Sequence, residues 1–359
     1  MKKILFYLQH EYHLSALMPI YDEFAKEKEY DLYFKCEGEK ERKFWVFTKN
    51  KDSEIEKRLK ERGFKIADNI SGFDLVFTGD LLRNYDDFNG VPIAFVNHGS
   101  GIKNVLYREL AKRTHEKYMI FVESEYRKTK ILEKQVLGQS EVYVVGMPKL
   151  DPLFNRKYDK LKFLAERHLS PDRPTILYAP TYKPTSIGLL KEHIFSLTKK
   201  YNLIVKLHPY SWQGHYAPHW HHKIFERKVK KLSNFYLVSK EDFDIVPYIS
   251  VCDMVITEAS SVMFEFLALD KSGVIFDLQN KYLKHSNGAP ILDEDTHFFL
   301  TDSFVHIQNS ADINDAVSSA LQRTPEMMSA IQKDKEFLFY KTDGQASARI
   351  KQIVEEKLW

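Results

Sequence analysis

Continuous apolar runs alternate with apolar residues at helical spacing along the chain. The run Ile4–Leu8 is apolar at every position, which predicts a strand buried on both faces. Helix-spaced apolar residues follow it at Leu14, Leu17, Met18, Tyr21 and Phe24. Further runs in this part of the chain predict strands at Leu32–Phe34, Phe44–Phe47, Leu75–Phe77, Ile93–Val96, Met119–Val122 and Tyr143–Val145. The order strand–helix–strand predicts a parallel α/β sheet with right-handed crossovers.

A second series of the same kind follows a stretch rich in Pro, Asp and Lys at residues 150–172. Its predicted strands are Ile176–Tyr178, Leu203–Leu207, Phe235–Val238, Met254–Thr257 and Val274–Phe276. The tail from Glu326 to Trp359 has a helical pattern. The sequence therefore predicts two doubly wound, Rossmann-like α/β domains facing a central cleft, with ligands bound beyond the carboxyl ends of the strands.

Composition narrows the class of protein. The 359 residues are 43% hydrophobic and 29% charged, which excludes a disordered chain and allows large buried cores. Lys and Arg number 53 against 50 Asp and Glu. The chain therefore lacks the large basic excess that would predict a nucleic-acid partner. Cys36 and Cys252 are far apart and form no Cys-x-x-Cys motif, which argues against a zinc ribbon and favours a reducing compartment. No apolar stretch approaches the roughly 20 residues of a membrane-spanning helix.

The first candidate for chemistry is His98, in a turn between the predicted strand Ile93–Val96 and a helical segment. An imidazole there can accept a proton near neutral pH, and Gly99 and Gly101 let a ligand approach the backbone. A structural histidine in an ordinary turn is the alternative.

The second candidate is His208, at the end of the predicted strand Leu203–Leu207. Pro209 stops the ladder there, and strand alternation puts Lys206 on the same face as His208. A cation beside an imidazole suits a phosphate group. A capping residue at a buried strand end is the alternative.

The third candidate is the segment Thr257–Glu265, where a predicted strand runs into a helix through Glu258, Ala259, Ser260 and Ser261. The two hydroxyls and the backbone N–H groups of the helix start predict an anion site. An ordinary serine N-cap is the alternative.

Other patterns are weaker. His215 and His219 have the spacing of metal ligands, but no Cys, Asp or Glu joins them and prolines interrupt the helix. Asp293–Asp295 is similar to the acidic triplet of metal-dependent sugar transferases but lies late in the chain. The basic run Arg227–Lys231 is typical of a solvated helix face or of contact with anionic lipid. No Walker A or Gly-x-Gly-x-x-Gly motif is present, so ATP hydrolysis and simple NAD binding are not expected.

Taken together, these motifs resemble the CDP-glycerol glycerophosphotransferase family, which primes and polymerises teichoic-acid-type polymers. The resemblance extends from Pro92 to Ile350 and rests on His98–Lys103, Leu177–Tyr182, Leu207–Pro209, Asp244–Tyr248, Asp253–Glu265 and Tyr340–Ile350. The chain departs from the family pattern where Glu258 and Ala259 replace Asp-Tyr, where Glu265 replaces Asp, and where Ser272 replaces the Pro after Lys271.

The resemblance implies a GT-B fold with an acceptor-binding domain at residues 1–155, a nucleotide-donor domain at 156–335 and a closing helix at 336–359 that crosses back to the first domain. It implies transfer of a polyol phosphate from a CDP-activated donor to a hydroxyl of a cell-wall or capsule-type polymer, or of its lipid-linked primer, with release of CMP. His98 would be the general base, and His208 would bond the transferring phosphate or CMP.

Ser260 and Ser261 would bind the donor phosphates. The remaining donor-site residues would be Thr257, Glu258, Thr181, Lys206 and Pro209. The acceptor side would comprise Gly99, Ser100, Gly101 and Lys103. The donor is CDP-glycerol or a related CDP-polyol, no metal or other cofactor is required, and the expected place of work is the cytoplasmic face of the cell membrane, bound peripherally to anionic lipid.

Three alternatives stay open. One is another GT-B enzyme, either a glycosyltransferase or a UDP-sugar epimerase. Another is a transferase that uses a related donor such as CDP-ribitol. The last is a non-catalytic protein that binds polymer or nucleotide, against which the presence of both His98 and His208 argues. The nucleotide released from a panel of activated donors separates them.

Overall fold

A computed structural model of the chain describes all residues except 39, 44–46, 89, 100–104, 156–157, 183, 191, 214–220, 230, 259 and 279–299. The described residues form two compact units. Unit 1 contains those of Met1–Ser100, Val105–Arg156 and Phe337–Trp359, and unit 2 contains those of Lys157–Glu336.

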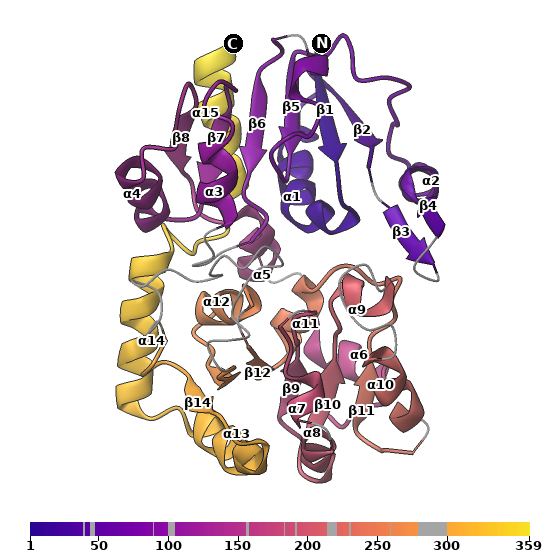
Figure 1. Cartoon of the computed structure of the whole chain (residues 1–359), viewed down its shortest axis with the longest axis vertical. Helices are drawn as coiled ribbons and strands as arrows, with labels where there is room; N and C mark the ends of the chain where they lie inside the picture. The colour runs from indigo at the N-terminus through magenta and orange to yellow at the C-terminus, as the bar shows by residue number, and fades with distance from the viewer. Residues whose placement is uncertain are drawn as a thin grey trace. The chain divides into compact units, whose positions relative to one another are not determined.

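Unit 1 is built on a parallel sheet of six strands in the order β2-β1-β5-β6-β7-β8 (Figure 1). Its strands are β1 (Lys2–Leu8), β2 (Tyr30–Cys36), β5 (Leu75–Thr78), β6 (Ile93–Val96), β7 (Met119–Val122) and β8 (Glu141–Val144). The predicted strand Phe44–Phe47 is not part of this sheet. Residues 44–46 lie outside the described residues, and Phe47 begins β4 (Phe47–Asn50), which pairs antiparallel with β3 (Lys40–Lys43).

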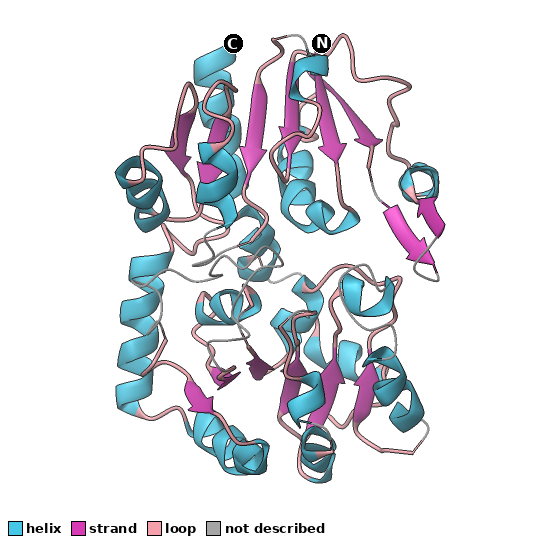
Figure 2. Cartoon of the chain, viewed as in Figure 1, coloured by secondary structure: helices cyan, strands magenta, loops and turns pink. Residues whose placement is uncertain are grey.

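Helices cover both faces of this sheet (Figure 2). Because side chains alternate along β1, Ile4 and Phe6 pack in one core with α1 and α15, whereas Leu5 packs in the other with α3 and α4. The helices of unit 1 are η1 (Glu11–His13), α1 (Leu14–Phe24), α2 (Asp52–Glu61), η2 (Tyr85–Phe88), α3 (Val105–Ala111), α4 (Glu125–Glu133), η3 (Pro148–Leu150), α5 (Asp151–Phe154) and α15 (Ala346–Leu358).

The end of the chain belongs to unit 1. The carboxylate of Asp151 accepts the backbone N–H groups of Ala346 and Ser347 at 3.1 and 2.8 Å, which caps the start of α15. The sequence pattern predicted helix from Glu326 to Trp359, but the structure breaks it between α14 (Pro325–Leu338) and α15. The break contains Gly344 at a φ of 71°, a conformation that favours glycine.

Unit 2 has a second parallel sheet of six strands in the order β11-β10-β9-β12-β13-β14. Its strands are β9 (Thr175–Tyr178), β10 (Asn202–Val205), β11 (Phe235–Leu237), β12 (Met254–Thr257), β13 (Gly273–Phe276) and β14 (Val305–Ile307). The sequence pattern missed β14, which is only three residues long and contains a histidine. The two parallel sheets confirm the predicted α/β class.

The main core of unit 2 lies between one face of this sheet and helices α7, α8, α10 and α13. The described helices of the unit, besides α14, are α6 (Lys160–Ala165), α7 (Ile187–Leu190), α8 (His193–Ser196), η4 (Leu197–Lys199), α9 (Pro209–Gln213), α10 (His221–Val229), α11 (Val246–Val251), α12 (Val262–Leu267), η7 (Ser310–Asp312) and α13 (Ile313–Gln322). Cys36 and Cys252 are buried and are not joined in a disulfide. No helix among the described residues combines the length and the apolar character needed to cross a membrane.

Candidate active site

Three neighbouring strands of unit 1 end in polar segments. β1, β5 and β6 are adjacent and parallel, so their carboxyl ends meet at one edge of the sheet. The segments that follow them are 9–13, 79–83 and 97–99. His98 therefore lies where ligands bind in such sheets, as predicted.

The backbone fixes the tautomer of His98. Its Nδ1 lies 2.5 Å from the carbonyl oxygen of Gly79, so Nδ1 carries the proton and donates it to that oxygen. Desolvation lowers the pKa of His98, against the opposing effects of the Asp80 charge and of this hydrogen bond. The ring is thus neutral near pH 7, with its lone pair on Nε2. This is the protonation state that a general base needs.

Two more aromatic side chains surround His98, and both come from the segment after β1. The ring centroid of His13 lies 4.7 Å from that of His98, and that of Tyr12 lies 5.3 Å from it. His13 is fully buried, and neither ring nitrogen has a hydrogen-bond partner among the described residues. A Cβ atom at residue 79 would lie 2.6 Å from Cγ of His13, so only glycine fits there. Tyr12 and His13 were not predicted as site residues; the signal for them was the run Gln9–His13 directly after a buried strand.

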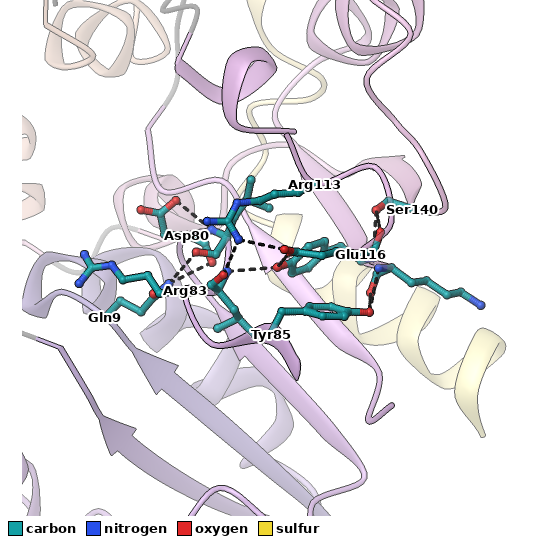
Figure 3. Close-up of polar contacts among 11 residues, drawn as sticks. Gln9, Asp80, Arg83, Tyr85, Arg113, Glu116 and Ser140 are labelled. Carbon is teal, nitrogen blue, oxygen red and sulfur yellow. Dashed lines mark hydrogen bonds and ion pairs between the residues drawn. The ribbon is translucent and has the colours of Figure 1, made fainter. Parts of the chain in front are cut away.

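The segment that carries Gly79 is held from two sides (Figure 3). Gln9 bonds the backbone of residues 81 and 83, donating at 3.0 Å and accepting at 3.2 Å. On the other side, Arg113 donates to the carbonyl of Leu82 at 2.7 Å and to Glu116 at 3.0 Å. This network fixes the carbonyl that orients His98.

A buried ion pair shapes the turn after β6. Arg127 donates to Glu123 from Nε at 3.1 Å and from Nη2 at 3.0 Å, and both side chains are almost fully buried. Asn97 donates from Nδ2 to the same carboxylate at 3.2 Å and to the carbonyl of Gly99 at 2.8 Å. Gly99 thus contributes a carbonyl that is already bonded. The other predicted acceptor-side residues, Ser100, Gly101 and Lys103, lie outside the described residues.

In unit 2, His208 has the opposite tautomer. The backbone N–H of Tyr210 donates to its Nδ1 at 3.2 Å, so the neutral ring carries its proton on Nε2. Pro209 begins α9 and turns the chain after β10. The ring centroid of His208 lies 4.6 Å from that of Tyr182 and 5.1 Å from that of Tyr210. His208 therefore carries its Nε2 proton within a group of aromatic rings.

Glu258 organises the segment after β9. Its carboxylate accepts the N–H groups of Thr181 and Ser186 at 2.8 and 3.1 Å, and their hydroxyls at 3.1 and 2.8 Å. Its side chain is almost fully buried, and desolvation raises its pKa to about 7 despite these four bonds. The predicted donor-site residues Glu258 and Thr181 therefore bond each other and hold the segment that carries Tyr182.

Two further predicted donor-site residues have protein partners. Thr257 is buried and donates its hydroxyl to the carbonyl of Ala179 at 2.7 Å. The strand prediction put Lys206 and His208 on one face, but β10 ends at Val205 and the ammonium of Lys206 donates to the carbonyl of Asp242. This carbonyl belongs to the segment after β11. Because Lys206 and His208 both follow the last residue of β10, strand alternation does not determine which way their side chains point.

Ser260 and Ser261 precede α12. The Ser261 side chain makes no N-cap hydrogen bond, and Ser260 Oγ accepts the N–H of Val262 at the long distance of 3.4 Å. α12 has only six residues, and Glu265 lies in its first turn, so its dipole adds little to an anion site. Any phosphate site here depends on the two hydroxyls.

The candidate metal ligands lie outside the described residues, whereas part of the basic run is described. His215, His219 and Asp293–Asp295 lie outside the described residues. Where the structure is described, carboxylates gather at Glu27, Glu29 and Glu355, next to the amino end of β2 and away from His98. In the basic run, Lys228 is paired with Glu192 at 2.5 Å.

Lys271, which precedes the departure from the family pattern at Ser272, caps the carboxyl end of α11. Its ammonium donates to three carbonyls there, each at 2.8 Å.

Solved structures with the same fold include enzymes of two kinds. The wall teichoic acid polymerase TagF matches with a TM-score of 0.68 and 13% identity, over 99% of this chain and 88% of that one. A TagF variant soaked with CDPG matches with a TM-score of 0.68 and 15% identity, over 99% and 89% of the chains. A putative UDP-N-acetylglucosamine 2-epimerase from Listeria monocytogenes matches with a TM-score of 0.63 and 13% identity, over 99% and 96%. These matches confirm the predicted GT-B fold.

Comparison with curated protein sequences finds no match. A family profile, described as CDP-glycerol:poly(glycerophosphate) glycerophosphotransferase, matches residues 91–356. This span contains His98, His208 and the Ser260–Ser261 pair, and it confirms the family resemblance predicted from those motifs. The chain belongs to the CDP-glycerol:poly(glycerophosphate) glycerophosphotransferase family, whose activity is that of a transferase.

Proposed function

We propose that the protein transfers glycerol phosphate from CDP-glycerol to the terminal hydroxyl of a poly(glycerophosphate) chain or its lipid-linked primer. The observation that carries the proposal is the tautomer of His98, whose Nδ1–H is bonded to Gly79, inside the segment that matches the family. The fold of the wall teichoic acid polymerase TagF, one variant of which was soaked with CDPG, supports the same donor.

The reaction balances with His98 as base. The acceptor hydroxyl gives its proton to Nε2 of His98, and its oxygen attacks the phosphorus that carries the glycerol. The bond between this phosphorus and the oxygen of the CMP phosphate breaks, and that oxygen leaves with the electron pair. A phosphodiester and CMP result, and the proton passes from His98 to solvent. General base catalysis of this kind contributes about 10²–10⁴-fold to the rate.

On the donor side, we assign His208 to a phosphate oxygen. Its proton on Nε2 can be donated to the transferring phosphate or to CMP, where negative charge grows as the bond breaks. The hydroxyls of Ser260 and Ser261 donate to the same phosphates. Thr181 and Glu258 hold the backbone that carries Tyr182, so they act as positioning residues.

Two further parts of the proposal concern the need for a metal ion and the location of the protein. Transfer proceeds without a metal ion, because His208 and the serine pair stabilise the phosphates.

Arg227 and Lys231 are basic residues that would attract anionic lipid at the inner face of the cell membrane. Sedimentation with anionic vesicles at low salt, reversed at high salt, tests this location. Failure to sediment contradicts it.

A donor panel tests the function. CDP-glycerol, CDP-ribitol and UDP-N-acetylglucosamine are each incubated with the protein and a glycerol phosphate primer, with and without EDTA. We expect CMP release from CDP-glycerol, a phosphodiester product by phosphorus NMR, and no loss in EDTA. Release of UDP with CDP-polyols inert would make the protein a GT-B glycosyltransferase. Epimerisation of the sugar nucleotide with CDP-polyols inert would make it a UDP-sugar epimerase.

A further inference from the structure

Arg83 bears a positive charge with neutral partners. Its Nη2 donates to Nε2 of His10 at 3.0 Å, and its Nη1 lies 3.5 Å from the carbonyl oxygen of Gly38. The side chain is exposed and forms no ion pair with any residue that the structure describes. Three other arginines of unit 1 pair with carboxylates: Arg58 with Glu11, Arg113 with Glu116, and Arg127 with Glu123. The charge of Arg83 is therefore available to an anion.

The pair Arg83–His10 lies one aromatic ring away from the proposed base. The Tyr12 ring stacks on that of His10 at 5.0 Å and contacts that of His98 at 5.3 Å. The buried His13 ring bridges the same two rings, at 5.4 Å from His10 and 4.7 Å from His98. Both bridging residues come from the segment after β1.

The position of Arg83 is fixed before any ligand binds. Its backbone N–H donates to Gln9 Oε1 at 3.2 Å, and the segment around it is held by the network of Figure 3. The charge of Arg83 reaches His13, whose pKa is lowered first by desolvation and also by this charge. Two nearby carboxylates have other partners: Asp80 Oδ1 accepts the N–H of Leu81 at 2.9 Å, and Glu37 Oε2 accepts the Tyr7 hydroxyl at 3.0 Å.

We propose that Arg83, oriented by His10, binds the phosphodiester nearest to the reacting hydroxyl of the acceptor. In poly(glycerophosphate) this phosphodiester is separated from the terminal hydroxyl by only the three carbons of one glycerol, so it lies close to His98 when the hydroxyl does. A guanidinium presents two parallel N–H donors to phosphate oxygens and suits this contact. The inference rests on the proposed function for the identity of the acceptor.

The test compares two acceptors in the variant Arg83→Gln. The first is a trimer of glycerol phosphate with a free hydroxyl end, and the second is glycerol, which has the hydroxyl but no phosphate. We expect KM for the trimer to rise about tenfold or more, as for loss of a charge-assisted hydrogen bond, and kinetics with glycerol to stay unchanged. Arg83→Lys should recover part of the affinity because it keeps the charge. Arg62→Gln, which removes an arginine that packs over Phe64, is the matched control and should change neither acceptor.

Calorimetric binding of the trimer without donor separates this inference from the proposed function. Weaker binding to Arg83→Gln than to the parent protein supports the subsite even if CDP-glycerol proves inert, a result that would overturn the proposed function alone. Equal binding of the trimer by both proteins overturns the subsite. An equal rise in KM for trimer and glycerol also overturns it, because it would show that Arg83 acts on the hydroxyl or on the fold.

Discussion

The turns that carry His98 and His208 each follow the carboxyl end of a parallel strand, and the two histidines differ in one hydrogen bond. Each histidine follows a buried parallel strand, β6 in unit 1 and β10 in unit 2. Nδ1 of His98 donates to a backbone carbonyl, whereas Nδ1 of His208 accepts from a backbone N–H. The first ring is left with a lone pair on Nε2 and the second with a proton there.

This difference shows that residue type and position do not settle the role of a histidine. The backbone group that bonds Nδ1 decides whether Nε2 is a base or a hydrogen-bond donor. Transfer of a phosphoryl group needs one of each, a base for the attacking hydroxyl and a donor for the phosphate oxygens. The predictions below test whether the two turns are specialised in this way.

The largest effect is expected at His98. His98→Gln keeps a polar side chain but has no basic nitrogen, so turnover should fall about 10²–10⁴-fold while calorimetric affinity for CDP-glycerol is unchanged. Release of CMP measures the loss. His115→Gln, at an exposed position of the same unit, is the control. Near-normal turnover in folded His98→Gln would remove this histidine from the mechanism.

At His208 the same substitution should be milder. A glutamine amide can still donate an N–H where Nε2–H was, so His208→Gln should stay within about tenfold of the parent turnover, and His208→Ala should lose about tenfold more. Steady-state rates of CMP release give both numbers. Equal losses from glutamine at positions 98 and 208 would show that the two tautomers do not mark two roles.

The serine pair sharpens the donor side of the comparison. Ser260→Ala combined with Ser261→Ala should weaken CDP-glycerol binding at least tenfold, since each lost bond to a charged phosphate contributes about 1.5–3 kcal/mol. Calorimetry with the donor measures this change. Unchanged affinity would leave His208 as the sole assigned phosphate contact in unit 2.

The pH profile tests the state of the base. Desolvation holds the pKa of His98 below 6.5, opposed by Asp80 and Gly79 and assisted by the charge of Lys149. Because the base works only when unprotonated, kcat/KM should be lost as pH falls through a value below 6.5. A steady-state series from pH 5 to 8 locates the midpoint. A midpoint clearly above 6.5 would contradict the assigned environment.

The smallest effect is one of stability in unit 2. The pKa of Glu258 is raised to about 7 from 4.5, so the folded state holds the proton more tightly and stability falls as pH rises between these values. Glu258→Gln stays neutral and can keep the bonds to Thr181 and Ser186. It should reduce this pH dependence by up to about 3 kcal/mol, seen in thermal midpoints at pH 4.5 and 8. Equal pH dependence in both proteins would rule out Glu258 as its source.

Much of the fold followed from apolar runs, because strands covered on both faces are apolar at every position. Met119–Val122 and Met254–Thr257 match β7 and β12 residue for residue. β3 and β4 were not predicted, because they form a separate antiparallel pair of mostly polar sequence. β14 was missed because three residues are too few for a pattern.

The site was less predictable, because its decisive partners are backbone groups far away in sequence. His98 and His208 could be singled out as imidazoles at strand ends. Nothing in the sequence shows that Gly79 faces the first of them or that His13 packs against it. The partner of Lys206 was hidden for the same reason, since Asp242 offers a carbonyl rather than a side chain.

The return of α15 to unit 1 has a consequence for biosynthesis. Ile350 and Val354 share a core with Ile4 and Phe6, so this part of the first sheet lacks the cover of α15 until that helix leaves the ribosome. Roughly 190 residues separate α5 from α15, which at 5–20 residues per second is about 10 to 40 s of translation. During that interval the strands of unit 2 are made, and the part of the first sheet that α15 covers remains exposed. The nascent chain should therefore depend on chaperones through the exposed sheet of unit 1.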